Sequence, residues 1–200
     1  MNFEQWIAFT FGLGDQKWSL AHASYPSSAE NALVNCMAFF TRSKEVLDTI
    51  PRDRACEALH VIPSVDGYLG LVCYPGIAPS ERLALVNAHI PLFKDSFCHD
   101  SFDDAAFMWW EHFVGARWEE GPSVGEDIGI CREIIRVLGD LLALNSETCQ
   151  LSALHGINEF AGLVFEDSGA EKIRGFLREG TVASHRVAEY AEQVLAGNAP

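Results

Sequence analysis

The most continuous hydrophobic pattern of the chain lies in residues 147–165, ETCQLSALHGINEFAGLVF. At about 100° per residue, its apolar side chains cover most of a helical wheel. Only Thr148, Ser152, His155 and Glu159 form a narrow polar stripe. A surface helix usually has an apolar face of about 100° or slightly more, so we expect neighbours to cover this helix on several sides.

Two glycines of this stretch, Gly156 and Gly162, predict close packing. Each costs roughly 1 kcal/mol of helix propensity relative to alanine. Without a side chain, each lets a neighbouring helix approach closely. We therefore expect the rest of the chain to pack around this helix, although the pattern itself names no reaction.

Apolar residues at three- and four-residue spacing predict further helices along the chain. A capping box, Ser27 to Glu30, begins one of them. Pro91 is expected to kink or divide its helix, because proline lacks a backbone donor. A turn is predicted at 167–169. The predicted helices span about residues 3–11, 15–23, 29–49, 52–61, 81–97, 102–114, 124–144, 147–165, 170–179 and 182–196.

Residues 61–79 have an ambiguous pattern. Asp66 and Gly67 between apolar runs are a hairpin signal, but Pro63 interrupts the first run. A short helix over 66–74 fits equally well. The chain as a whole predicts one all-α domain over residues 1–200, built from stacked antiparallel helical pairs, with a short hairpin or irregular segment around 61–79.

Composition narrows the classes of function. The 200 residues are 48% hydrophobic and 21% charged, as in ordinary globular proteins. The net charge is −14, from 28 acidic and 14 basic residues. Nucleic-acid binding usually needs a basic surface, so this charge disfavours it, and it equally disfavours an anionic membrane surface. A basic protein partner is compatible with it.

The chain also predicts a cytoplasmic protein. No apolar run reaches the roughly 20 residues of a membrane span. The N-terminus has no positively charged region and carries Glu4, unlike a secretory signal. The cysteines are scattered without a C-x-x-C pair, at positions 36, 56, 73, 98, 131 and 149. We expect them to be reduced and mostly buried.

Short sequence similarities point to a helical repeat architecture. ALHVI at 58–62 recurs as ALHGI at 153–157. The SALHGINEF helix, the two helices after it and the WWEHF run at 109–113 resemble HEAT-like α-solenoid proteins of bacteria, over about the last half of the chain. That resemblance implies a binding scaffold, since the histidine–glutamate pairs of iron-binding hydroxylases of this architecture are absent. Some HEAT-like proteins act on nucleic acid, but the net charge disfavours that branch.

The polar stripe of the 147–165 helix is the first candidate site. Ser152, His155 and Glu159 are the residue types of acyl-transfer catalysis. His155 and Glu159, four residues apart, also have the spacing of two metal ligands. However, all three lie on one regular helix, and no oxyanion hole is suggested. We favour a stripe that faces solvent, or a histidine hydrogen-bonded between helices.

A second candidate lies in residues 98–112. Asp104 and Glu111 fall on one helical face with His112 beside them, which suggests a divalent-cation site. Carboxylates at a helix N-terminus are also favoured by the helix dipole alone. No known ligand spacing is met, so we predict no metal and no cofactor. The full cluster is Cys98, His99, Asp100, Asp103, Asp104, Glu111 and His112.

Aromatic residues form a third candidate, because Trp is a frequent anchor of protein interfaces. Burial in the core would account for Trp110 and for Trp109. Trp118 lies beside Glu119 and Glu120 and is hardest to explain as a core residue. We therefore regard Trp109 and Trp118 as candidate binding residues.

Together these patterns predict an acidic helical module that binds another protein, in its most specific form an immunity or antitoxin-type protein that neutralises a basic toxin. The alternative is a small helical enzyme or ligand-binding protein with a pocket near His155 and Glu159 or near the 98–112 cluster. A homo-oligomer, whose second copy covers the wide apolar arcs, is a third possibility.

Overall fold

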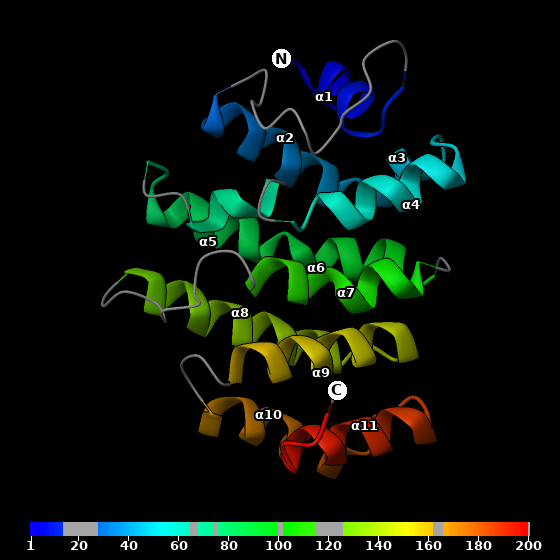
Figure 1. Ribbon diagram of the computed structural model, residues 1–200, viewed down its shortest axis with the longest axis vertical. Coiled ribbons are helices and arrows are strands. Elements are labelled where there is room, and N and C mark those ends of the chain that lie inside the picture. The colour runs from blue at the N-terminus through cyan, green and yellow to red at the C-terminus, as the bar shows by residue number, and fades with distance from the viewer. Residues whose placement is uncertain are drawn as a thin grey trace.

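The computed structural model describes residues 1–13, 28–64, 68–73, 76–99, 102–114, 126–161 and 166–199. Among them, the side chains at 68–69, 73, 112–114, 126–127, 161 and 166–167 lie outside the description. The described residues form helices and turns without any strand, which confirms the predicted all-α class. Figure 1 shows the helices in successive layers, from α1 (Phe3–Thr10) at one end to α10 (Glu166–Glu179) and α11 (His185–Leu195) at the other. The HEAT-like relationship between these layers stays a prediction.

Between these ends the chain alternates helices with short connections. Residues 68–73 form a 3₁₀ helix, in agreement with the helical alternative for this part of 61–79, whereas Asp66 and Gly67, the hairpin signal, lie outside the described residues. The predicted helix at 15–23 lies outside the described residues. The intervening elements are α2 (Ala29–Thr41), α3 (Ser43–Leu47), α4 (Arg52–Val61), the 3₁₀ helix η1 (Tyr68–Cys73), α5 (Pro79–Asn87), α6 (His89–Leu92), the π-helical η2 (Phe93–Phe97), α7 (Asp103–Val114), α8 (Glu126–Leu142) and α9 (Glu147–Ala161).

Pro91 divides its helix, as predicted. Proline has no N–H to donate to the Asn87 carbonyl, and α5 ends at that residue before α6 and η2 continue. The Asn87 side chain donates to the Leu83 carbonyl at 2.9 Å and to Glu133 Oε1 at 2.7 Å. The end of α5 is thereby attached to α8, whose Arg136 also donates to Asn87.

Two predicted boundaries differ from the structure. The 29–49 helix is interrupted at Arg42, which has a non-helical backbone (φ −116°, ψ 20°) between α2 and α3. The turn predicted at 167–169 is wrong, because α10 begins at Glu166 and passes through these residues. Aspartate and serine are common both in turns and at helix starts, so the local sequence fits either structure.

Helix α9 is the inner helix that its hydrophobic pattern predicts. It packs against α7, α8, α10 and α11, and residues 151–157 are all buried. A Cβ atom at Gly156 would lie 2.8 Å from Leu138 Cδ2 and 2.8 Å from Trp110 Cγ. The missing side chain is therefore what lets α9 approach α7 and α8 this closely. Gly162 lies outside the described residues.

One buried amide ties the C-terminal layers together. Gln150 of α9 is fully buried, and its Nε2 lies 3.1, 2.9 and 2.8 Å from the carbonyls of Leu142, Leu144 and Thr181, so its two hydrogens are shared among three acceptors. Its Oε1 accepts the backbone N–H of Ala183 at 2.8 Å. This one side chain thereby pairs backbone groups at the end of α8 and in the α10–α11 connection. Buried backbone groups left unpaired would destabilise the fold.

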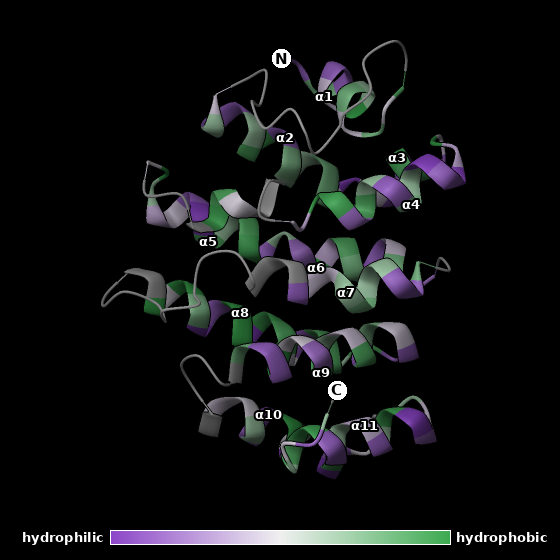
Figure 2. Ribbon diagram, viewed as in Figure 1, coloured by the Kyte–Doolittle hydropathy of each residue, from purple (hydrophilic) through white to green (hydrophobic). Residues whose placement is uncertain are grey.

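The apolar surfaces of the described helices are covered within the chain. Helices α4 and α11 carry both hydrophobic and hydrophilic residues (Figure 2), as helices with one exposed face do. Val34 is the large hydrophobic side chain that is exposed in the described part of the chain. Burial of the apolar arcs there does not require a second copy, and the homo-oligomer stays a prediction.

An aromatic cluster surrounds the fully buried His89. Its ring centroid lies 4.9 Å from that of Phe40, 6.0 Å from Trp109 and 5.1 Å from Trp110. Its Nδ1 lies 3.0 and 2.9 Å from the Leu85 and Val86 carbonyls and therefore carries the proton. Burial among these rings lowers the pKa of His89 to about 4, outweighing the carbonyl hydrogen bonds.

We expect Gly156→Ala to destabilise the fold by about 1–3 kcal/mol, because the new methyl group overlaps Trp110 and Leu138. Gly175→Ala is the matched control, since a Cβ there has no heavy atom within 4 Å. It should stabilise the protein by up to about 1 kcal/mol through helix propensity. Urea unfolding of both variants measures the difference, and equal shifts would contradict close packing at Gly156.

His89 should make stability fall with acidification. The unfolded chain takes up a proton at the usual pKa near 6.5, whereas folded His89 does so only near 4, so the stabilisation is complete above pH 6.5 and is lost as the pH falls toward 4. The full contribution is about 3 kcal/mol. His89→Asn retains an N–H donor but does not titrate, so its unfolding free energy should depend less on pH. Urea unfolding at a series of pH values between about 4 and 7 measures both proteins, and equal slopes would contradict the effect.

Candidate functional site

A cleft of about 500 Å³ lies where α7, α9 and α11 meet. Its apolar part consists of Phe107 of α7, which is partly exposed, and Leu151 of α9. Polar and charged side chains form the rest of its wall. The lining residues are Asp103, Asp104, Phe107, Glu147, Thr148, Leu151 and Arg186.

The cleft carries an excess of negative charge. Three carboxylates line it, from Asp103, Asp104 and Glu147, and Arg186 is the cation among its lining residues. Arg186 Nη1 lies 3.3 Å from Glu147 Oε1, and both side chains are solvent-exposed, at 74% and 41%. Thr148 donates its hydroxyl hydrogen to Asp103 across the α7–α9 seam. Asp104 remains largely open to solvent, at 89% side-chain exposure.

Two histidines on different helices each face a carboxylate of α7. His60 Nε2 of α4 lies 3.4 Å from Asp104 Oδ2, and His155 Nε2 of α9 lies 3.5 Å from Glu111 Oε2. These histidines are the equivalent positions of the recurring ALH sequence at 58–60 and 153–155. Helix α7 lies between α4 and α9, and the structure thus joins residues from both predicted polar clusters.

His155 joins three helices. Its ring stacks on Phe107 of α7, with centroids 4.3 Å apart and planes 16° apart. Its Nδ1 lies 3.0 Å from the Tyr190 hydroxyl of α11. The histidine is only 5% exposed, so it lies at the inner margin of the cleft wall. This is the predicted alternative of a histidine hydrogen-bonded between helices.

The Glu111 carboxylate indicates the tautomer of His155. His155 Nε2 faces the Glu111 carboxylate across 3.5 Å, which favours the tautomer with a proton on Nε2, so that Nδ1 accepts from the Tyr190 hydroxyl. Burial, assisted by the charge of Glu159, raises the pKa of the Tyr190 hydroxyl to about 12. Tyr190 therefore keeps its proton at neutral pH and can donate this hydrogen bond.

Ser152 is unavailable as a nucleophile. Its side chain is fully buried and donates its hydroxyl hydrogen to the Ala106 carbonyl of α7. This contact between α9 and α7 keeps the hydroxyl away from solvent. It also keeps the hydroxyl away from His155 Nδ1, which is already hydrogen-bonded to Tyr190. Glu159, one turn beyond His155, is partly exposed. The stripe is thus largely covered, and the expectation that it faces solvent is wrong for Ser152 and His155.

The structure divides the 98–112 cluster. Asp103 and Asp104 line the cleft, whereas Glu111 lies farther along α7 beside His155. The His112 side chain and all of Asp100 lie outside the described residues. Within the described ranges, no three His, Cys, Asp or Glu side chains come together in a way that could hold a metal ion.

The structure describes two of the three tryptophans considered above, Trp109 and Trp110. Trp109 is fully buried, with its ring centroid 5.4 Å from that of Phe97 and 5.8 Å from that of Phe40. It therefore belongs to the core and presents no surface to a partner, contrary to its selection as a binding residue. Trp110 is equally buried. Trp118 lies outside the described residues.

Sequence reasoning missed five contributors to this site: Phe107, Glu147, Leu151, Arg186 and Tyr190. Their convergence depends on how α7 and α11 pack against α9, which no local pattern specifies. One signal was present for Tyr190, because a tyrosine within an apolar helical stripe usually buries its ring and needs a partner for its hydroxyl.

Comparison with protein-family models, with curated proteins and with solved structures found no match. In the portion of the chain that the structure describes, no helix combines the length and the apolarity that crossing a membrane requires.

We expect Tyr190→Phe to destabilise the protein by about 1–2 kcal/mol, because it leaves the buried His155 Nδ1 without its donor. Urea unfolding measures the effect. The same change in a His155→Phe background should cost less, since no acceptor is then left unpaired. Equal costs in the two backgrounds would show that the hydrogen bond contributes nothing.

Proposed function

We propose that the protein binds a basic segment of another protein through the cleft between α7, α9 and α11. The observation that carries the proposal is the combination of a concave surface with three carboxylates around an apolar patch. A net charge of −14 would favour association with a basic partner over long range.

The chemistry of the cleft fits a lysine or arginine side chain. Such side chains place an apolar stem on apolar surface and a charged head in a polar environment. Phe107 and Leu151 offer the apolar surface, and the largely exposed Asp104 side chain can accept a new partner in addition to His60. Arg186 is exposed and paired with Glu147, so an incoming cation can compete for that carboxylate.

Binding has better support than catalysis at this site. The hydroxyl of Ser152 and the Nδ1 of His155 already serve the packing of α7, α9 and α11. A nucleophile–base pair needs direct hydrogen-bond contact, which these two residues do not make in the described structure. A protein that neutralises a basic toxin is one form that such a binding function would take.

A small organic cation is the second candidate for the same cleft. Its volume of about 500 Å³ falls in the range of small-molecule sites. The peptide and the small ligand are distinguished by titrating spermidine in parallel. Spermidine binding as tight as peptide binding would favour the small ligand.

A short lysine- and arginine-rich peptide should bind the wild-type protein, with affinity that falls as salt concentration rises. Asp104→Lys and Glu147→Lys should each weaken binding roughly tenfold, because each places a cation where the peptide's cation lies. Isothermal titration calorimetry at low and physiological ionic strength measures the dissociation constants.

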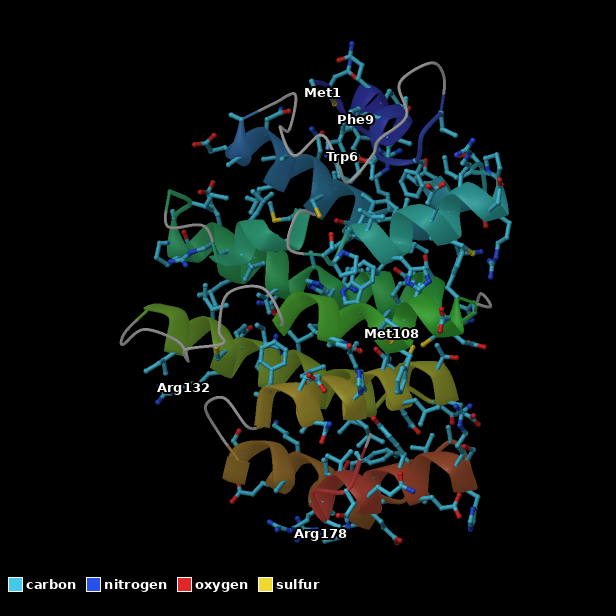
Figure 3. All side chains as sticks on the ribbon, viewed as in Figure 1. Met1, Trp6, Phe9, Met108, Arg132 and Arg178 are labelled. Carbon is cyan, nitrogen blue, oxygen red and sulfur yellow. The ribbon has the colours of Figure 1, made fainter. Side chains whose placement is uncertain are left out.

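Glu179→Lys is the matched control, because it changes the net charge of the protein by the same amount. Glu179 is exposed at the end of α10, beside Arg178, whose side chain lies at the α10–α11 end of the molecule, opposite Met1 (Figure 3). An equal loss of affinity in all three variants would mean that overall charge, and not the cleft, attracts the peptide, and it would refute the proposal.

A further inference from the structure

Two cysteines that are distant in sequence meet at the boundary between η2 and α9. Cys98 is the residue that directly follows η2, and Cys149 lies in the first turn of α9, 51 residues later. Their Sγ atoms are 2.9 Å apart. A disulfide bond has an S–S distance of about 2.0 Å, so bond formation needs only a small approach of the two sulfur atoms.

The two thiols differ in exposure. Cys98 is partly exposed, whereas Cys149 is fully buried and its Sγ also lies 3.7 Å from the Phe93 carbonyl. A soluble oxidant can therefore reach the first sulfur, while the second is held directly behind it. This is the arrangement of an attacking thiol with a neighbouring resolving thiol.

The hydrogen bond between the two thiols also shifts their pKa values in opposite directions. The Cys149 thiol donates to Cys98 Sγ, which lowers the pKa of Cys98 to about 7, with a smaller contribution from Ser146. Desolvation and the charge of Asp95 act in the opposite direction. The same hydrogen bond, together with burial, raises the pKa of Cys149. Near neutral pH a substantial fraction of Cys98 is thus the nucleophilic thiolate.

We propose that Cys98 and Cys149 form an oxidative modification site, at which a hydroperoxide converts the dithiol into an intramolecular disulfide. The chain then carries a reversible covalent link between the end of η2 and the first turn of α9. This site is separate from the proposed binding function and does not depend on it.

The chemistry balances in two steps. The Cys98 thiolate attacks one oxygen of hydrogen peroxide, the O–O bond breaks, and Cys98 becomes a sulfenic acid while hydroxide leaves. The Cys149 sulfur then attacks the sulfenic sulfur, the S–O bond breaks, and the departing oxygen takes the Cys149 proton and leaves as water. The two sulfur atoms together lose two electrons, and the peroxide gains them.

The test begins with the reduced full-length protein, exposed to hydrogen peroxide and then alkylated. The intact mass before alkylation should fall by about 2 Da, two hydrogen atoms for one disulfide. Digestion without reductant should yield one peptide pair joined through Cys98 and Cys149, and dithiothreitol should restore the original mass. Retention of all thiols, or a disulfide that joins other cysteines, would overturn the proposal.

Single-cysteine variants test the order of the steps. Cys149→Ser removes the resolving thiol, so Cys98 should accumulate as sulfenic acid and form an adduct with dimedone. Cys149→Ala also removes the hydrogen-bond donor, so the dimedone adduct should still form at Cys98 but more slowly than in Cys149→Ser. Cys98→Ser should abolish the disulfide and leave Cys149 unmodified, because that sulfur is buried.

Cys56→Ser is the control variant. Cys56 of α4 is also partly exposed, but it makes no hydrogen bond to another thiol in the described part of the chain. The variant should form the Cys98–Cys149 disulfide at the wild-type rate. In the wild-type protein, Cys98 should react roughly tenfold faster than Cys56, because the contact with Cys149 stabilises the Cys98 thiolate. Equal reactivity of the two residues would show that the contact with Cys149 has no chemical consequence.

Discussion

The close approach of α9 to α7 and α8 at Gly156 is the constraint on which the C-terminal layers depend. There is no room between the Gly156 backbone, Trp110 and Leu138 for even a methyl group without displacing one of them. Once α9 is held at that distance, its whole middle section is buried, and α10 and α11 can cover its remaining sides. A helix enclosed in this way must satisfy every polar group it carries, because buried unpaired donors and acceptors each cost about 1–3 kcal/mol.

That requirement explains the polar stripe of α9 without any reaction. Ser152 of the stripe donates to a carbonyl of α7, and His155 accepts from Tyr190 of α11. Gln150, outside the stripe, joins α8 to the α10–α11 connection. These three side chains link α9 to different neighbours and fix how the layers align. The side chains that are free to bind a partner lie at the edge of the contact between α7 and α9. There the carboxylates of the first turns of both helices reach solvent around Phe107.

Local sequence patterns were informative where the cause is local. The period of the apolar residues predicted an inner helix at α9, and the missing amide proton of Pro91 predicted the division between α5 and α6. They failed where a residue's role depends on contacts with helices that are distant in the sequence. The same three polar residue types, serine, histidine and glutamate, suit a catalytic stripe or a set of packing contacts, and the positions of α7 and α11 distinguish the two. Trp109 was compatible with the core but was also a candidate binding residue, because its burial depends on Phe40 and Phe97 from other parts of the chain.

The first turn of α9 is where the structural and chemical features converge. Glu147 and Thr148 line the acidic cleft, and Cys149, the next residue, contacts Cys98. Thr148 already connects this turn to Asp103 at the start of α7, and Cys98 lies five residues before Asp103. The segment between η2 and α7 is therefore attached to α9 at both of its ends, by a hydrogen bond at one and by a thiol pair at the other. A disulfide would make the second attachment covalent, and it would form without using a carboxylate of the cleft. Acidic recognition and thiol chemistry can thus occupy the same turn without competing for the same atoms.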